Sequence, residues 1–307
     1  MKRFLFSLTI LLSLITSCYA QIEITLKRQF VDDFADRVTI DSNFRVDVTS
    51  KVHSAKDDGD IHAAGTAPEI GMAAVAEVMN AKTEKAQAVK QLVDAAGTNH
   101  PVPISGAWRI WSEHGGEQDY VQGQTVPVLD SSGAAHVFEI HPITKVAGRD
   151  VSHTWEPIAG FTYKDPDDAF TIYERTKSHI SEQNGMVTIS TEKSGYNYTE
   201  FVAKLLTDPK PLNGGTYVFA SIHDDQGELL VKERRLVFAA GTPPEQTILA
   251  MHKGQIVQVL GIPRVSLKLV QWRLGHHSGK FANSLDWNLP YEMIVAAILD
   301  ENPGGTE

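Results

Sequence analysis

The sequence is poor in cysteine, with Cys18 as the single one among 307 residues. A mature chain that begins after it would have no thiol, which excludes disulfides, cysteine nucleophiles, iron–sulfur clusters and thiolate zinc sites. Stability must then come from a hydrophobic core. With 42% hydrophobic and 21% charged residues, the chain can form one large or two medium globular domains.

Several motifs of common enzymes are also missing. The sequence has no Gly-x-Ser-x-Gly elbow, no phosphate-binding Gly-Lys-Ser/Thr loop, no dinucleotide fingerprint between a strand and a helix, and no His-Glu-x-x-His. Serine hydrolases, nucleotide hydrolases and Rossmann-type oxidoreductases therefore lose support.

Basic residues are outnumbered by acidic ones, 28 to 38, for a formal net charge of −10. Such a surface repels phosphate backbones, so general nucleic-acid binding is disfavoured. A cation, an uncharged small molecule or a component of the cell envelope is the kind of partner that fits this charge.

The N-terminus has the composition of an export signal. Lys2 and Arg3 precede an apolar run from Phe4 to Ile15, which is too short for a membrane-spanning helix of about 20 residues. We expect residues 1–20 to be an export signal and to contribute nothing to the fold. The protein is then periplasmic, extracellular or anchored to the envelope by lipid.

Two cleavage sites compete in this leader. Cys18-Tyr19-Ala20 before Gln21 suits an ordinary signal peptidase, whereas Ile15-Thr16-Ser17-Cys18 resembles a bacterial lipoprotein box. The aromatic residue after Cys18 favours soluble export. A lipid on Cys18 would be the one contact with a membrane.

The first half of the chain is predicted to be mostly strands. Residues 36–48 alternate apolar and polar side chains, with a break near Ser42 and Asn43, and residues 73–79 form a short apolar run. Residues 107–114 read as another strand. Residues 126–129 and 136–141 form a plausible hairpin around an Asp-Ser-Ser-Gly turn.

Two helices are expected to cover these strands. Residues 83–96 have helical periodicity, with Thr83 as a cap and Gly97 as a stop. The second helix opens at Asp165-Pro166, where Asp165 caps and Pro166 takes the first helical position, and it ends near Lys177.

The second half is again rich in β patterns. Strands are predicted over residues 186–191, 196–206, 216–222, 229–238, 256–260 and 265–274, and residues 291–299 fit either a strand or a helix. Many short strands with few helices indicate a sandwich or small barrel. We therefore predict a mainly β protein with two or three short helices: a β-barrel-like domain over residues 21–177, then a β-sandwich or second barrel over residues 178–307. No internal repeat is evident.

Two strand-like runs carry the chemistry. Asp60 and His62 share one face of the first run, and Glu139 and His141 share one face of the second. Carboxylates and imidazoles are ligands of divalent metals. If the two strands are neighbours, these four residues could hold a metal whose bound water acts in hydrolysis. Glu77 or Glu113 would then be the general base, and Asp58 and His114 are further candidates.

Two other interpretations compete with a metal-dependent hydrolase. The same side chains could form a buried hydrogen-bonded network that fixes the register of a barrel, or they could form a ligand site without a metal. In the first case the protein is a non-catalytic binding or envelope module. Trp108 and Trp111 would pack in its core or, less often, contact a ligand.

Three motifs resemble those of a group of exported bacterial proteins whose activity is unassigned: Asp58-Gly59-Asp60-Ile61-His62, Gly106-Ala107-Trp108-Arg109 and Phe138-Glu139-Ile140-His141-Pro142. The resemblance covers residues 36–175. It implies a β-barrel domain related to oligonucleotide/oligosaccharide-binding (OB) barrels, and it transfers no catalytic role.

Overall fold

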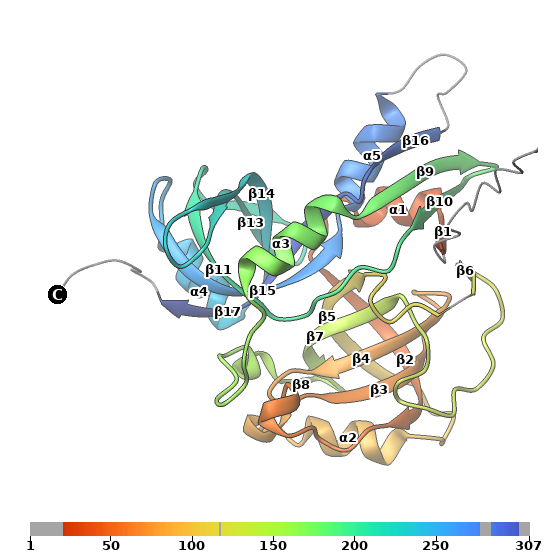
Figure 1. Cartoon of the computed structure of the whole chain (residues 1–307). Coiled ribbons are helices and arrows are strands. Elements are labelled where there is room, and N and C mark those ends of the chain that lie inside the picture. The colour runs from red at the N-terminus through yellow and green to blue at the C-terminus, as the bar shows by residue number, and fades with distance from the viewer. Residues whose placement is uncertain (1–20, 117, 277–283, 301–307) are drawn as a thin grey trace, which may run out of the picture.

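The computed structural model describes residues 21–116, 118–276 and 284–300. The predicted leader, including Cys18, lies outside these residues. The fold is mainly β, with 45% strand and 18% helix, as Figure 1 shows. The expectation of a mainly β protein with barrel architecture is confirmed.

The first barrel closes from five strands (Figure 1). Its strands are β2 (Thr39–Thr49), β3 (Ile61–Thr66), β4 (Ala73–Val78), β5 (Val102–Ile110) and β7 (Phe138–Val146), and the short β8 (Arg149–Asp150) pairs with β7. The order around the ring is β2-β3-β4-β7-β5 and back to β2, with β4 and β7 parallel and the other pairs antiparallel. This is a five-stranded Greek-key barrel of the OB type.

The second barrel repeats this order. Its strands are β11 (Thr199–Leu205), β13 (Gly215–His223), β14 (Leu229–Ala239), β15 (Ile256–Val265) and β17 (Tyr291–Asp300), with β12 (Lys210–Leu212) beside β13. The ring runs β11-β13-β14-β17-β15 and back to β11, and again the third and fifth strands are parallel. The chain therefore contains two barrels of one topology, although the sequence shows no repeat.

A third sheet is assembled from segments that flank the barrels. Its order is β16 (Ser284–Asn288), β9 (Lys177–Gln183), β10 (Met186–Thr191), β1 (Ile22–Lys27) and β6 (Tyr120–Val121). Along the chain, β6 comes between β5 and β7, the fourth and fifth strands of the first barrel. In the same way, β16 comes between β15 and β17, the fourth and fifth strands of the second. This sheet joins strands from both sides of the predicted boundary at residue 177.

Five α-helices occur in the described part of the chain: α1 (Arg28–Phe34), α2 (Ala88–Ala95), α3 (Pro166–Arg175), α4 (Pro243–Leu249) and α5 (Leu267–Gly275). α2 and α4 hold equivalent places between the third and fourth strands of their barrels. The carboxylate of Asp165 accepts hydrogen bonds from the backbone N–H groups of Asp167 and Asp168, so α3 begins as predicted. None of the helices among these residues is long and apolar enough to span a membrane.

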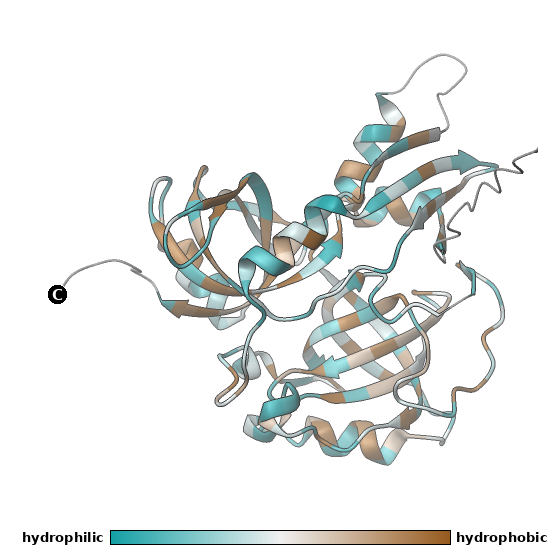
Figure 2. Ribbon diagram, in the orientation of Figure 1, coloured by the Kyte–Doolittle hydropathy of each residue, from teal (hydrophilic) through white to brown (hydrophobic). Residues whose placement is uncertain are grey.

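Alternating side chains build the barrel interiors, and Figure 2 shows the mixture of hydrophobic and hydrophilic positions along the strands. At Gly65 a Cβ would lie 1.9 Å from the backbone oxygen of Arg45, and at Gly106 it would lie 2.7 Å from that of Pro142. Both glycines lie near register shifts in their strand pairs. They allow the close backbone approach at which the strands bend.

The barrels meet through their outer faces. A second hydrophobic cluster contains Ala107 of β5 together with Val237, Leu260, Ile262 and Ile294 of the second barrel. Arg264 of β15 is buried and donates to the backbone oxygens of Val38 and Trp108 at 3.0 and 3.1 Å. Side chains that point out of each barrel therefore form a shared core.

Several local predictions for the first half were wrong. Residues 42–43 lie inside the continuous strand β2, which changes neighbours there from β5 to β3. The helix begins after Gln87 rather than Thr83, and it buries Ala88 and Leu92. Residues 126–129 are not a strand, so the expected hairpin is absent and β7 pairs with β4 and β5 instead.

In the second half, the strand predicted over residues 256–260 continues to Val265 as β15, and residues 267–275, predicted as part of a strand, form α5. Apolar runs of this length do not separate helix from strand. The ambiguous closing segment is the strand β17.

Candidate metal centre

The predicted residues gather on the outer face of the first barrel. In β3, Ile61 and Ala63 belong to the hydrophobic core, so His62 between them points outward. His62 lies opposite Glu77 of β4 in the strand register, and Glu139 of β7 lies opposite Arg109 of β5. The alternation of four neighbouring strands thus directs imidazoles, carboxylates and one guanidinium to the same face.

His141 lies at the centre of this cluster. Its Nδ1 is 3.4 Å from a carboxylate oxygen of Glu77 and 3.4 Å from one of Glu139. Its Nε2 is 3.3 Å from Oδ2 of Asp60. Asp60 and His141 have no exposed surface, and Glu77 and Glu139 are 3% and 2% exposed. Asp60 of the first run and Glu139 and His141 of the second therefore lie in one buried cluster.

The second barrel covers the cluster with Tyr198, which immediately precedes β11. Its hydroxyl donates to Oδ2 of Asp60 at 2.6 Å and lies 2.8 Å from Nε2 of His141. Tyr198 is itself 1% exposed. Closure of the site depends on contact between the two barrels.

Arg109 supplies the buried positive charge. Its guanidinium donates to Glu139 at 2.6 Å, to Glu113 at 3.1 Å and to the backbone oxygen of Pro263 at 2.9 Å. Pro263 belongs to β15, so this side chain also links the barrels. The cluster also contains three carboxylates with at most 3% exposure, those of Asp60, Glu77 and Glu139, of which Glu139 contacts Arg109.

The two buried glutamates differ in their pKa values. Burial raises the pKa of Glu77 well above its usual range, although His141 opposes the shift. Burial acts on Glu139 too, but Arg109 together with His136 and His141 outweighs it and holds the pKa of Glu139 well below its usual range. Position relative to Arg109 separates the two carboxyl groups.

The pKa values of two histidines are shifted in opposite directions. Burial lowers the pKa of His141, but Glu77, Asp60 and Glu139 more than compensate and raise it to about 10. Burial and the neighbouring His53 and His141 lower the pKa of His62 to about 3.

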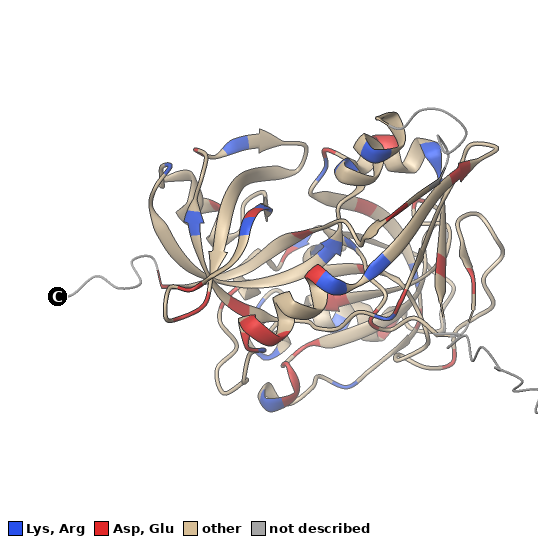
Figure 3. Ribbon diagram, turned by 45° about the horizontal axis from the view of Figure 1, so that its top comes forward, with Lys and Arg blue, Asp and Glu red and all other residues tan. Residues whose placement is uncertain are grey.

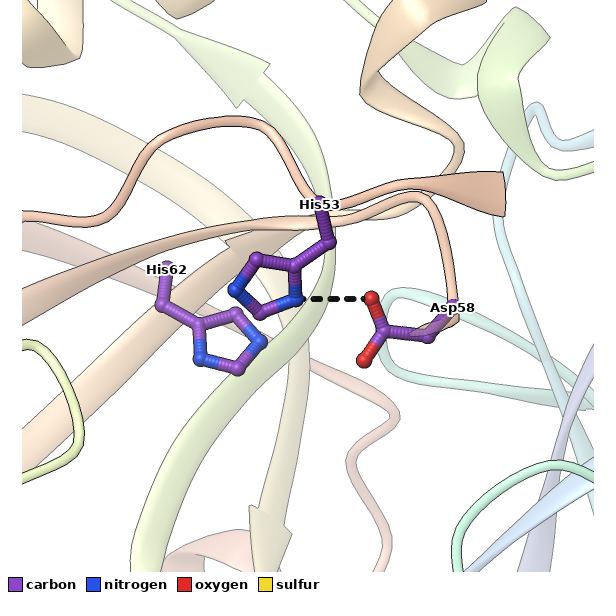
Figure 4. A group of neighbouring side chains, drawn as sticks. All are labelled: His53, Asp58 and His62. Carbon is purple, nitrogen blue, oxygen red and sulfur yellow. Dashed lines mark hydrogen bonds and ion pairs between the residues drawn. The ribbon is translucent and has the colours of Figure 1, made fainter. Parts of the chain in front are cut away.

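Among the residues that the structure describes, three groups of side chains have the spacing needed to hold a metal ion. Two are buried, and the third is partly exposed: Asp60, Glu77 and His141; Glu77, His136 and Glu139; His53, Asp58 and His62. In the partly exposed group, Nδ1 of His53 is 2.9 Å from Oδ1 of Asp58, and the ring of His62 lies beside that of His53 (Figure 4).

Some distances in the buried groups match the spacing of metal ligands. Ligand atoms of a tetrahedral ion with bonds of about 2.0–2.1 Å are about 3.3–3.4 Å apart. Nδ1 of His141 lies 3.4 Å from Glu77, and Nε2 of His136 lies 3.3 Å from Glu139. Asp60 lies 3.3 Å from the other ring nitrogen of His141, so these contacts do not all belong to one coordination sphere. Nε2 of His62 and Nε2 of His136 are buried without a hydrogen-bond partner.

The predicted ligands do not all share one group. Asp60 and His141 belong together, but Glu139 belongs with His136, and His62 with His53 and Asp58. Glu77, predicted as a general base, is the residue common to both buried groups. Glu113 pairs with Arg109 and lies 3.9 Å from His114, and neither belongs to these groups.

Sequence reasoning missed four residues of the site: His53, Arg109, His136 and Tyr198. His136 opens the same run as Glu139, three residues earlier, and that spacing was a usable signal. Arg109 was placed on a strand but given no role, and Tyr198 is distant in the sequence, with no pattern to indicate it. Trp108 and Trp111 are 0% and 1% exposed, so both pack in the core and neither offers a face to a ligand.

Comparisons with known proteins give no family. No protein-family model and no curated protein matches the chain. A solved structure described as "Structural mimicry for functional antagonism" aligns at 12% identity over 83% of this chain and 90% of that chain, with a TM-score of 0.20. A similarity of that size carries no argument about fold or function.

Proposed function

We propose that the protein is an exported, non-catalytic binding module whose buried cluster holds a divalent cation and fastens the two barrels together. Asp60, Glu77 and His141 would be its ligands, with Glu139 and His136 beside them. The observation that carries the proposal is burial: these ligands are at most 4% exposed, and Tyr198 of the second barrel covers them. Structural metal sites are closed in this way, whereas catalytic ones keep an open position.

Charge supports the same function. As metal ligands, Glu77 would be ionised and His141 neutral. The three buried carboxylates would then exceed Arg109 by two negative charges, which a divalent cation would neutralise. A buried charge that has no partner destabilises the fold by several kcal/mol, on the order of the 3–5 kcal/mol lost when a buried ion pair is broken. Binding the ion would therefore favour the docked arrangement of the barrels over a separated one.

Metal analysis of the purified mature chain tests the proposal. We expect one equivalent of a divalent metal in the wild type and in a His252→Ala control, whose imidazole is 78% exposed. His141→Ala and Glu77→Gln should lose it. A wild type that binds no zinc, manganese or cobalt on titration, with His141→Ala merely less stable, would support a metal-free network instead.

Cobalt substitution then separates a closed site from a catalytic one. In a closed site the visible spectrum of the bound cobalt should not change when azide or cyanide is added, because no coordination position is open. A spectrum that responds to these anions would overturn the structural role and favour catalysis.

The metal-dependent hydrolase remains a second candidate because of the partly exposed group. The side chains of His53, His62 and Asp58 are 29%, 22% and 23% exposed, so an ion there could keep a water. Nε2 of His62 is 3.4 Å from Glu77, which would act as the base. Metal-dependent ester hydrolysis that is lost in His53→Ala, with the buried metal still bound, would support this candidate.

A further inference from the structure

A second polar site, whose lining contains no residue of the metal groups, lies beside the second barrel. A cavity of about 440 Å³ is enclosed by the end of α3, the start of β9, α5, β16 and the start of β17. Its size is within the range of small-ligand sites. An adjoining cavity of about 300 Å³ shares Arg234, Leu269 and Tyr291 with it and extends along β13 and β14.

Two cations of the larger cavity converge on one residue. The ammonium group of Lys177 donates to Oδ1 of Asn288, and the guanidinium of Arg273 donates to the backbone oxygen of Asn288 at 2.9 Å. Within the described part of the chain, neither cation forms an ion pair with a carboxylate. The acids that line the same cavity are engaged elsewhere: Glu174 accepts from Arg234, and Asp286 contacts His179.

Burial and the nearby Arg234 lower the pKa of Arg273 to about 10, which is the direction expected where positive charge is not balanced. An arginine and a lysine that meet in this way offer donors to a single carboxylate or phosphate group. Lys177 and Arg273 belong to the blue residues of Figure 3, within a chain that is acidic as a whole.

An aromatic platform lies beside these cations. Trp287 is 55% exposed, and the guanidinium carbon of Arg273 lies 5.2 Å from its ring centroid. An exposed tryptophan at the edge of a polar cavity presents a flat apolar face against which a sugar ring can pack. Asn288 adds a polar side chain at the same edge.

We propose that this cavity binds an acidic oligosaccharide, with the carboxylate of one uronic-acid unit on Lys177 and Arg273 and its ring on Trp287. Barrels of this type bind both oligosaccharides and oligonucleotides. The sugar fits better here because two unpaired cations match one carboxylate, whereas a run of phosphates needs a cationic track that this acidic chain lacks. The neighbouring cavity, with Tyr217 and Tyr291, provides room for the next unit.

This inference names the ligand of the binding module proposed above, and it can fail separately because its residues do not contact the metal cluster. Calorimetric titration of the full mature chain with trigalacturonic acid tests it. We expect saturable one-to-one binding with quenching of tryptophan fluorescence, and affinity at least tenfold weaker in Lys177→Ala, Arg273→Gln and Trp287→Ala.

Matched controls keep the test specific. Trp272→Ala removes a tryptophan that is 52% exposed and packs on His276 outside both cavities, and Arg175→Gln removes an exposed arginine. Both should bind like the wild type, and so should His141→Ala if it folds, whatever its metal content. Lys177 is exposed, so its variant should fold normally.

Three results would overturn the inference. The first is no binding of trigalacturonic acid at millimolar concentration. The second is equal binding of a neutral trisaccharide, since the carboxylate would then be irrelevant. The third is tighter binding of a short oligothymidylate, which would identify single-stranded nucleic acid as the ligand.

Discussion

The hydroxyl of Tyr198 donates to Oδ2 of Asp60 at 2.6 Å across the boundary between the two barrels. These residues are 138 positions apart in the sequence, and both are buried. The same hydroxyl lies 2.8 Å from His141. One tyrosine therefore connects the second barrel to the centre of the cluster.

Replacement of Tyr198 by phenylalanine should weaken this connection. Asp60 and His141 would lose a buried partner, so we expect the free energy of unfolding to fall by about 1–3 kcal/mol. Urea titration followed by circular dichroism measures it. Tyr217→Phe is the control, because the Tyr217 ring packs on Arg235 and Phe219 away from the cluster. Equal stability of the two variants would contradict the role of Tyr198.

The two buried glutamates should respond differently to glutamine. Burial raises the pKa of Glu77 well above its usual range and so favours its neutral form in the metal-free protein. Glu77→Gln should therefore change metal-free stability by less than about 1 kcal/mol. Glu139 is ionised against Arg109, so Glu139→Gln leaves this buried guanidinium with Glu113 as its one carboxylate partner among the described residues and should cost about 3 kcal/mol. Urea titration in a chelator compares them. A larger loss in Glu77→Gln would refute this assignment.

Stability of the metal-free protein should decline on both sides of pH 6.5. His141 has a pKa of about 10 in the fold against 6.5 unfolded, so its contribution is complete below pH 6.5 and is lost as the pH rises to about 10. His62 has a pKa of about 3 in the fold against 6.5 unfolded. Its contribution to stability is therefore complete above pH 6.5 and is lost as the pH falls to about 3.

Two variants test which residue causes the decline in stability at high pH (the alkaline limb) and which causes the decline at low pH (the acidic limb). His141→Gln should flatten the alkaline limb of the stability profile, and His62→Gln should reduce the acidic one. The measurement is the melting temperature between pH 4 and pH 10 in the presence of a chelator. If stability still declines at high pH in His141→Gln, that decline is caused by another group.

Arg264 should be essential to barrel docking. It donates to Glu292 at 2.7 Å, its guanidinium carbon lies 3.8 Å from the Trp108 ring centroid, and it reaches the backbone of Val38. Removing it leaves Glu292 buried without this partner, at a cost of about 3–5 kcal/mol. Arg264→Ala should therefore unfold at much lower urea concentration than Arg149→Ala, a change at an exposed position. Similar midpoints for the two would argue against this role.

Local patterns predicted a good part of this fold. Strands β2 and β4 follow from alternation and apolar runs, and the start of α3 follows from Asp165 and Pro166, because each depends on neighbours within a few residues. The same local signals failed at α5, whose apolar residues fit a strand equally well. They also gave no sign that two barrels share one strand order.

The sequence by itself determined which atoms could form a site. Alternation put Asp60 with His62 and Glu139 with His141, and the absence of cysteine after Cys18 limited the ligands there to oxygen and nitrogen. Tertiary structure decided how they combine. Pairing of β4 with β7 brought Glu77 to His141, and docking of the second barrel brought Tyr198 to Asp60. Such contacts between distant segments depend on how whole strands pair and pack, and no local pattern encodes them.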